Sequence, residues 1–439
     1  MAEPDAKHAL RTLTEAATAT VGASGRGVEP FRGIALHDTR KDETFTSLAA
    51  FDETSKTVAS LALLQQRYGV DEAPRVTLQF VYEWLDRVDQ PHFQEEAFDQ
   101  LWEDFSAELE DPDWVFRIIA NVRWLTAEGG PFDFGDGVSI RGRSFEELRE
   151  LRFSQPILDA LSEDFSGFGA SSYVMSVETR VPKSPDNFIL GNVGTDQAKA
   201  WRVLGALRLL APGDISIGRM WMSRPARFNV GLGGVGSAGF SIPAIGSPYH
   251  LTEPLAAEVP EMVEALRHLE ERGYGTSSGN LGLALRSYMA TYDRWPSTGD
   301  SRVLDAITAV EAVLGSETEI AFKLSFRMAG VLGGDEAERA AIFREMKAYY
   351  DLRSKLVHGA ALKEKHHALL ADPERLRRLV RELLRGFVHL DATPGHGYGK
   401  AWFREHLDVA LQVESERVAL REALNLRKTG NPGRNPGRR

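Results

Sequence analysis

The second half of the chain has apolar residues at helical spacing almost throughout. Within residues 255–425 this spacing predicts helices around 262–269 and 281–289, then over 302–314, 319–332, 336–358, 374–390 and 400–424. Glycines follow three of these segments, at Gly315, Gly333 and Gly359, and Pro373 stands where another helix should begin. The pattern therefore predicts an all-α helical bundle over residues 255–425.

The first half has a mixed pattern. Helical spacing covers residues 44–70, 93–110 and 195–209, whereas β-branched and aromatic residues predict strands over 114–125, 172–181, 214–222 and 227–230. Residues 129–141 predict a hairpin that turns at Asp136 and Gly137. We therefore expect an α+β region over 31–254. We expect a flexible leader, 1–30, before this region. The basic tail 426–439 repeats Asn-Pro-Gly-Arg and should be disordered.

Composition and charge narrow the choice of function. The chain has 439 residues and no cysteine, which excludes disulfides, thiolate nucleophiles and cysteine-based zinc sites, and no run approaches the ~20 apolar residues of a membrane span. We expect a cytoplasmic protein. The net charge is −11, but residues 301–425 are neutral and 426–439 carry +5, so 1–300 carry −16. An acidic surface repels RNA, so we expect the first two-thirds to contact a protein; the alternative is an ordinary solvated surface.

Two other motifs point to no cofactor or metal. The segment Gly231–Gly236 matches the letters of a dinucleotide fingerprint, but Pro243 and Pro248 follow where the phosphate-binding helix should run. His366 and His367 are adjacent, so on a helix their side chains point about 100° apart and converge poorly on a metal. We expect both to be surface histidines, and we expect neither a cofactor nor a metal site.

One predicted helix, 336–358, has a cation where its apolar pattern predicts leucine. The apolar residues on this face are Met346, Tyr349, Tyr350, Leu356 and Val357. Arg353 projects from the centre of that face, where a guanidinium is costly unless it is paired. His358 is the last residue before Gly359, and a helix C-terminus favours the imidazolium. A sheltered cation and a titratable ring suit chemistry on a phosphate. The alternative is a structural ion pair for Arg353 and a solvated end for His358.

The same region resembles a known family. The segments 302–315, RVLDAITAVEAVLG, 322–329, FKLSFRMA, and 350–359, YDLRSKLVHG, are similar to the Apea-like HEPN family of helical domains. The last segment fits the family's Arg-x4-6-His ribonuclease motif with Arg353 and His358. Many members have an amide after the arginine where this chain has Ser354, a hydroxyl that can also donate and accept hydrogen bonds. The resemblance covers about the last third of the chain.

Other residues near the motif should support it. Glu311 lies on the flank of the apolar stripe of 302–314 and is the natural carboxylate to hold Arg353 in a bidentate pair, although an exposed position is an equal alternative. Ser354 and His358 are four residues apart, so the hydroxyl could tune the ring, with Asp351 on that face but more remote. Tyr350 should pack, or else contact RNA.

These observations lead to one expectation and two alternatives. RNA supplies its own 2′-hydroxyl nucleophile, so histidine and arginine suffice for its cleavage without a metal. The resemblance implies this division of roles, a homodimer that joins two motifs in one cleft, and antiviral, abortive-infection or stress defence. We expect an endoribonuclease with an N-terminal sensing region that meets a protein trigger. The alternatives are a non-catalytic HEPN module that binds a nucleotide or partner, and a structural helical dimer.

Overall fold

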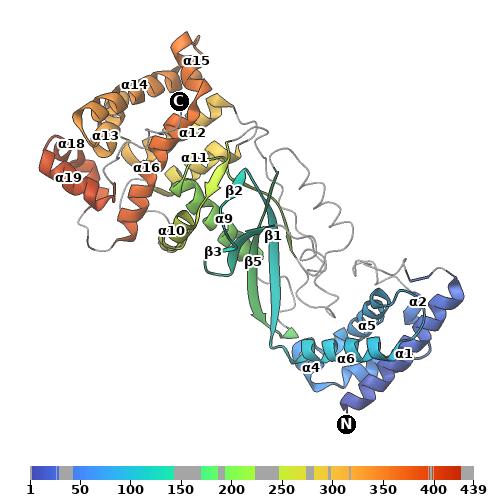
Figure 1. Ribbon diagram of the computed structural model, residues 1–439. Helices are drawn as coiled ribbons and strands as arrows, with labels where there is room; N and C mark the ends of the chain where they lie inside the picture. The colour runs from blue at the N-terminus through green and yellow to red at the C-terminus, as the bar shows by residue number, and fades with distance from the viewer. Residues whose placement is uncertain are drawn as a thin grey trace. The chain divides into compact units, whose positions relative to one another are not determined.

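The structure, a computed structural model, describes residues 2–25, 27–28, 43–142, 170–185, 193–222, 247–272, 281–294, 298–315, 318–393, 395, 398 and 400–426. The chain divides into two compact units (Figure 1). The first unit consists of Met1–Asn121, Gly135–Ala200 and Arg219–Gly239. The second consists of Val122–Phe134, Trp201–Gly218 and Phe240–Arg439.

The first unit contains a cluster of helices. They are α1 (Ala2–Ser24), α2 (Glu43–Thr46), α3 (Phe51–Ala59), α4 (Ala62–Arg67), the 3-10 turn η3 (Val70–Glu72), α5 (Ala73–Arg87) and α6 (Glu95–Glu110). Helix α5 packs against α1, α3 and α6 (Figure 1). Its Trp84 is fully buried and donates a 2.9 Å hydrogen bond to Thr18 Oγ1 of α1.

Two sequence expectations for these helices are corrected. The flexible leader is wrong for residues 2–24, because Leu10, Leu13, Ala17 and Val21 recur at helical spacing and are buried on one face of α1. The single helix expected over 44–70 is divided into short pieces. The helix expected over 93–110 is confirmed as α6, with its aromatic residues buried.

The strands come between α6 and α10 in the sequence, together with α9. They are β1 (Asp113–Arg123), β2 (Leu125–Ala127), β3 (Phe132–Asp133), β4 (Val138–Gly142), β5 (Ala170–Pro182), β6 (Ser216–Met222) and β7 (Tyr249–Leu251). One sheet has the order β3-β4-β5-β1-β6, with β4 and β5 antiparallel, and β2 pairs with β7 in parallel. The expected turn is confirmed, since Asp136 and Gly137 have φ of 51° and 76°. The predicted strand 227–230 and the loop Gly231–Gly236 lie outside the described residues.

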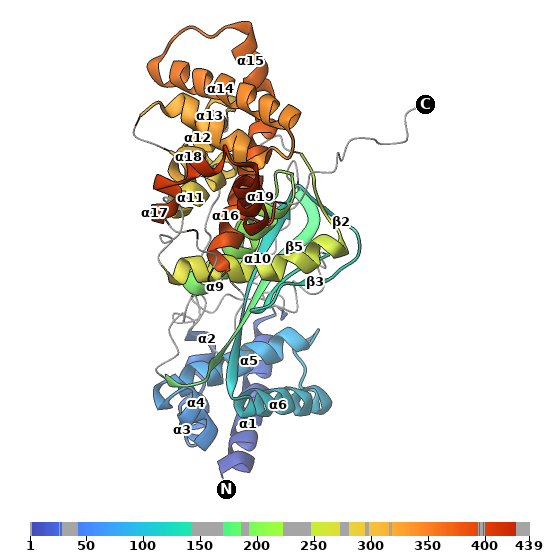
Figure 2. The ribbon, with the colours of Figure 1, turned by 90° about the vertical axis from the view of Figure 1, so that its left-hand side faces the viewer.

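The second unit is mostly helical. Its helices are the end of α9 (Val193–Leu210), α10 (Glu253–Glu271), α11 (Leu281–Asp293), α12 (Gly299–Leu314), α13 (Ile320–Leu332), α14 (Glu336–His358), α15 (Glu364–Ala371), α16 (Pro373–Ala392), α17 (Lys400–Glu405), α18 (Leu407–Ala410) and α19 (Glu414–Ala423). Helices α13 and α14 pack together, as do α10 and α16 (Figure 2). The pattern missed α15 and predicted α17 to α19 as one helix. None of the described helices has the length and apolar character needed to cross a membrane.

Ion pairs of buried arginines join distant segments within the second unit. Arg208 makes two 2.7 Å hydrogen bonds to Asp293, and Asp214 accepts one of 2.7 Å from Arg377. Both guanidinium carbons lie 4.4 Å from the centre of the Tyr292 ring. Residues 201–218 therefore belong to the helical unit, so its extent differs from the 255–425 domain expected from the sequence. The tail 427–439 lies outside the described residues.

Candidate active site

Helix α14 positions the predicted catalytic pair. The Asp335 side chain accepts a 2.8 Å hydrogen bond from the Glu338 amide and caps the start of the helix. At the other end Gly359, at φ 64°, stops the helix directly after His358. His358 thus lies in the last turn, as the sequence predicts.

The buried face of α14 differs from the predicted face. The helix buries Ile342, Met346, Tyr349 and Leu352. Arg353 follows Met346 by seven residues and Tyr349 by four, so it projects from the same face as these two, with 29% of its side chain exposed. Val357 is 53% exposed. Arg353 is therefore on the buried face of the helix, as expected, but is only half-buried, and the last turn of α14 has an apolar residue that this unit leaves exposed.

Glu311 of α12 holds the Arg353 guanidinium. Arg353 Nη2 lies 3.3 Å from Glu311 Oε2, and the carboxylate is itself only 22% exposed. A single contact joins the two side chains instead of the bidentate pair expected. Tyr350 completes the group, since the guanidinium carbon lies 5.8 Å from its ring centre. Burial and the nearby charge of Glu311 raise the pKa of the Tyr350 hydroxyl.

His358 points away from this cluster. It is exposed, and it follows Arg353 by five residues, which on a helix is a rotation of about 140° and a rise of about 7.5 Å. Ser354 is half-buried, and no hydrogen bond joins these two described residues, Ser354 and His358. Within one chain, the arginine and the histidine therefore face different directions.

Asp351 serves another histidine. Its carboxylate lies 2.9 Å from His366 Nε2, and His366 Nδ1 accepts a 3.0 Å hydrogen bond from the Lys363 amide. The hydrogen bond to His366 lowers the pKa of Asp351. His366 is fully buried, which corrects the expectation of two surface histidines, although His367 is exposed. Asp351 thus fixes α15 against α14 instead of supporting His358.

Two further observations concern metal binding and similarity to known proteins. Among the described residues, no three His, Asp or Glu side chains are placed to hold a metal ion. Comparison of the chain with protein-family models, with curated proteins and with solved structures gives no match. Any functional conclusion therefore depends on the residues of the site itself.

Proposed function

We propose that the chain is a metal-independent endoribonuclease of the HEPN type that acts in the cytoplasm. The observation that carries the proposal is a half-buried guanidinium, tied to Glu311, five residues before a histidine in the last turn of the same helix. Arginine is suited to bind a phosphate and to stabilise the charge that develops on it. Histidine is the side chain best suited to move a proton near neutral pH.

The reaction needs only these groups and the RNA. The ribose 2′-oxygen attacks the adjacent phosphorus while a base, assigned to His358, removes the hydroxyl proton. The bond from phosphorus to the 5′-oxygen breaks, and the leaving oxygen takes up a proton. The products are a 2′,3′-cyclic phosphate and a 5′-hydroxyl. Arg353 contributes by stabilising the negative charge on the non-bridging oxygens, and Glu311 orients it.

A homodimer would solve the geometric problem within one chain. Because Arg353 and His358 point about 140° apart on α14, one chain does not direct both at the same phosphate. Two antiparallel copies of α14 would place the arginine of one chain near the histidine of the other. The exposed Val357 and the half-exposed Tyr350 and Leu356 would be buried in that contact. Light scattering should then give twice the monomer mass. A monomeric protein that cleaves RNA would contradict the proposed homodimer but not the proposed nuclease activity.

The acidic first part of the chain fits a regulatory role. Residues 1–300 carry a net charge of −16, whereas 301–425 are neutral. We assign RNA cleavage to the second unit and recognition of a protein trigger to the first, in a defence response. The fragment 255–425 is not a suitable test of this division, because it lacks Arg208 and Asp214, two buried residues that make ion pairs within the second unit.

The proposal is tested on the purified full-length protein with a structured RNA and EDTA. Arg353→Ala and His358→Ala should each lower the cleavage rate by on the order of 10²-fold or more. Arg344→Ala is the matched control, because Arg344 is exposed on the same helix. It should cleave like the wild type. Loss of activity in EDTA, or an unchanged rate for His358→Ala, would refute the proposal.

A further inference from the structure

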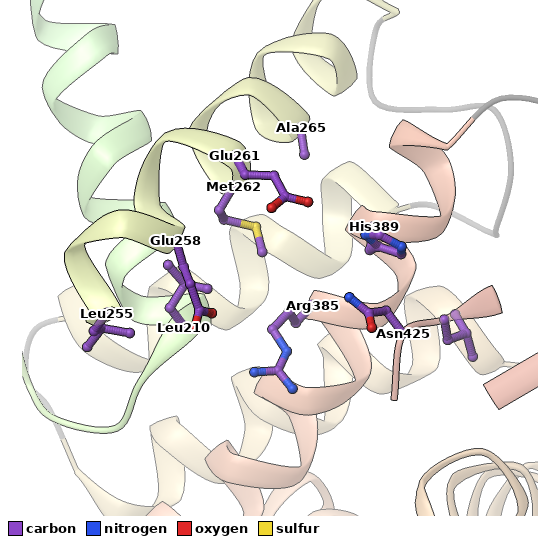
Figure 3. A pocket seen from close by; sticks show the side chains of 10 residues that line it. Leu210, Leu255, Glu258, Glu261, Met262, Ala265, Arg385, His389 and Asn425 are labelled. Carbon is purple, nitrogen blue, oxygen red and sulfur yellow. The ribbon is translucent and has the colours of Figure 1, made fainter. Parts of the chain in front are cut away.

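A pocket of about 230 Å³ lies in the second unit, away from the residues assigned to RNA cleavage (Figure 3). Helices α10 and α16 form its two walls, and the residues after α19 close one side. The lining residues are Leu210, Leu255, Glu258, Glu261, Met262, Ala265, Arg385, His389, Leu424 and Asn425. None of them has a part in the proposed nuclease.

The two walls carry opposite charges. Glu258 and Glu261 are three residues apart on α10, and Arg385 and His389 are four residues apart on α16, so each pair shares one helix face. Figure 3 shows the carboxylates on one side of the pocket and the guanidinium and imidazole on the other. The pocket thus presents an anionic wall and a cationic wall.

These charges do not neutralise one another across the pocket. Of the described side chains, none forms a hydrogen bond or ion pair with Glu258, Glu261, Arg385 or His389 that crosses from one wall to the other. The electrostatic interaction that Arg385 does make is with Glu382, three residues earlier on its own helix. A half-buried guanidinium gains most from a charge-assisted hydrogen bond to an anion. The neighbouring carboxylates repel each other, so a cation placed between them would be stabilised.

Between the charged walls the surface is apolar. Leu210 and Leu255 contribute half-exposed aliphatic groups, and the largely buried Met262 points into the space between Glu261 and Arg385 (Figure 3). Apolar atoms with a few placed polar groups are typical of small-molecule sites. The volume is below the ~300–1,000 Å³ of sites for drug-sized ligands. The occupant must therefore be small.

We propose that this pocket binds a small zwitterion with an apolar body, of the class of a free amino acid with an apolar side chain or a short apolar peptide. Its ammonium group would lie against Glu258 and Glu261, and its carboxylate against Arg385 and His389. Its side chain would cover Leu210 and Met262. The two carboxylates would repel a polyanion, so the pocket is not a groove for RNA.

Calorimetric titration of the full-length protein tests this assignment. The probes are L-phenylalanine, the dipeptide Leu-Leu, N-acetyl-phenylalanine, which lacks the cation, and phenylalanine amide, which lacks the carboxylate. Phenylalanine or Leu-Leu should bind. The probe that binds more tightly shows whether the pocket takes a free amino acid or a short peptide. Either blocked derivative should bind about ten- to a hundredfold more weakly, because each loses one charge-assisted contact.

Matched variants locate the binding site. Arg385→Gln, and separately Glu258→Gln with Glu261→Gln, should weaken binding by about tenfold or more. Arg378→Gln, an exposed position on the same helix α16, should bind like the wild type. The proposal is overturned if neither zwitterion binds, if the blocked derivatives bind equally well, or if Arg385→Gln leaves binding unchanged while circular dichroism shows it folded. None of these outcomes affects the nuclease proposal, which does not involve these residues.

Discussion

The substitution Asp214→Asn tests the buried ion pairs that hold the second unit together. Asp214 Oδ1 accepts a 2.7 Å hydrogen bond from Arg377, and its Oδ2 accepts one of 2.7 Å from the Ser247 amide. Both charged side chains are almost completely buried, at 4% and 3% exposed. Asparagine keeps the shape of the side chain and removes its charge, so the Arg377 guanidinium would remain buried beside a neutral partner.

The burial of both side chains determines how much stability Asp214→Asn should lose. Removing one partner of a buried ion pair typically lowers the free energy of unfolding by about 3–5 kcal/mol. Glu374 also bonds Arg377 and would compensate in part, so we expect about 3 kcal/mol. With a slope of roughly 1–3 kcal/mol per molar urea, the unfolding midpoint should fall by about 1 M or more.

The pH dependence gives a second measure of the same interaction. Burial alone would raise the pKa of Asp214, but the charge and hydrogen bond of Arg377, with the Ser247 amide, hold it below the usual range. A carboxylate with a lowered pKa stabilises the fold above its unfolded pKa of about 3.9, and this stabilisation is lost as the pH falls further. Wild type and Asp214→Asn should therefore differ most near pH 7 and converge below about pH 4.

Urea unfolding followed by circular dichroism is the assay. Glu264→Gln provides the control, because Glu264 pairs with Arg267 on the exposed surface of α10. Exposed pairs contribute little, so this variant should unfold with the wild type. If Asp214→Asn unfolds at the same midpoint as Glu264→Gln at pH 7, the buried pair does not stabilise the unit as described.

Two further pairs of variants test other local features by thermal unfolding. His366→Ala should cost about 2–4 kcal/mol, because it leaves a cavity and removes the hydrogen bonds of the ring to Asp351 and to the Lys363 amide, whereas exposed His367→Ala should cost little. Equal stabilities of the two histidine variants would contradict the buried position of His366. Gly137→Ala should destabilise far more than Gly359→Ala. Both have positive φ, which costs alanine about 1–2 kcal/mol, but only at Gly137 would the new Cβ lie 2.1 Å from a carbonyl oxygen, that of Glu178. Similar melting temperatures for these two would show that the turn is not as tight as described.

Most helices of the second unit could be predicted because their signals are local. Spacing of apolar residues, the Asp335 cap and the Gly359 stop all lie within a few residues of the element that they define. Helix α1 was missed because Ala and Thr dominate its sequence, so the few larger residues that repeat at helical spacing were given too little weight. A helix of small residues can still bury a continuous face.

Features that depend on distant partners could not be predicted in the same way. Arg208 is paired with a residue 85 positions later, so the pattern around it does not show that 201–218 joins the helical unit. His366 is buried because Asp351 of the preceding helix bonds its ring, whereas its own helix resembles an exposed one. The contact of Glu311 with Arg353 was anticipated from helical periodicity, but its single-contact geometry was not.

The chemistry of the cleaved RNA ends tests the central claim most directly. Purified full-length protein should cut a synthetic RNA in EDTA and leave a 2′,3′-cyclic phosphate and a 5′-hydroxyl, as measured by mass spectrometry. A single 2′-deoxy substitution at the cleaved position should block the cut, and His358→Ala should abolish it while His367→Ala does not. Products with a 5′-phosphate, or cleavage of the 2′-deoxy substrate at the same site, would contradict the account.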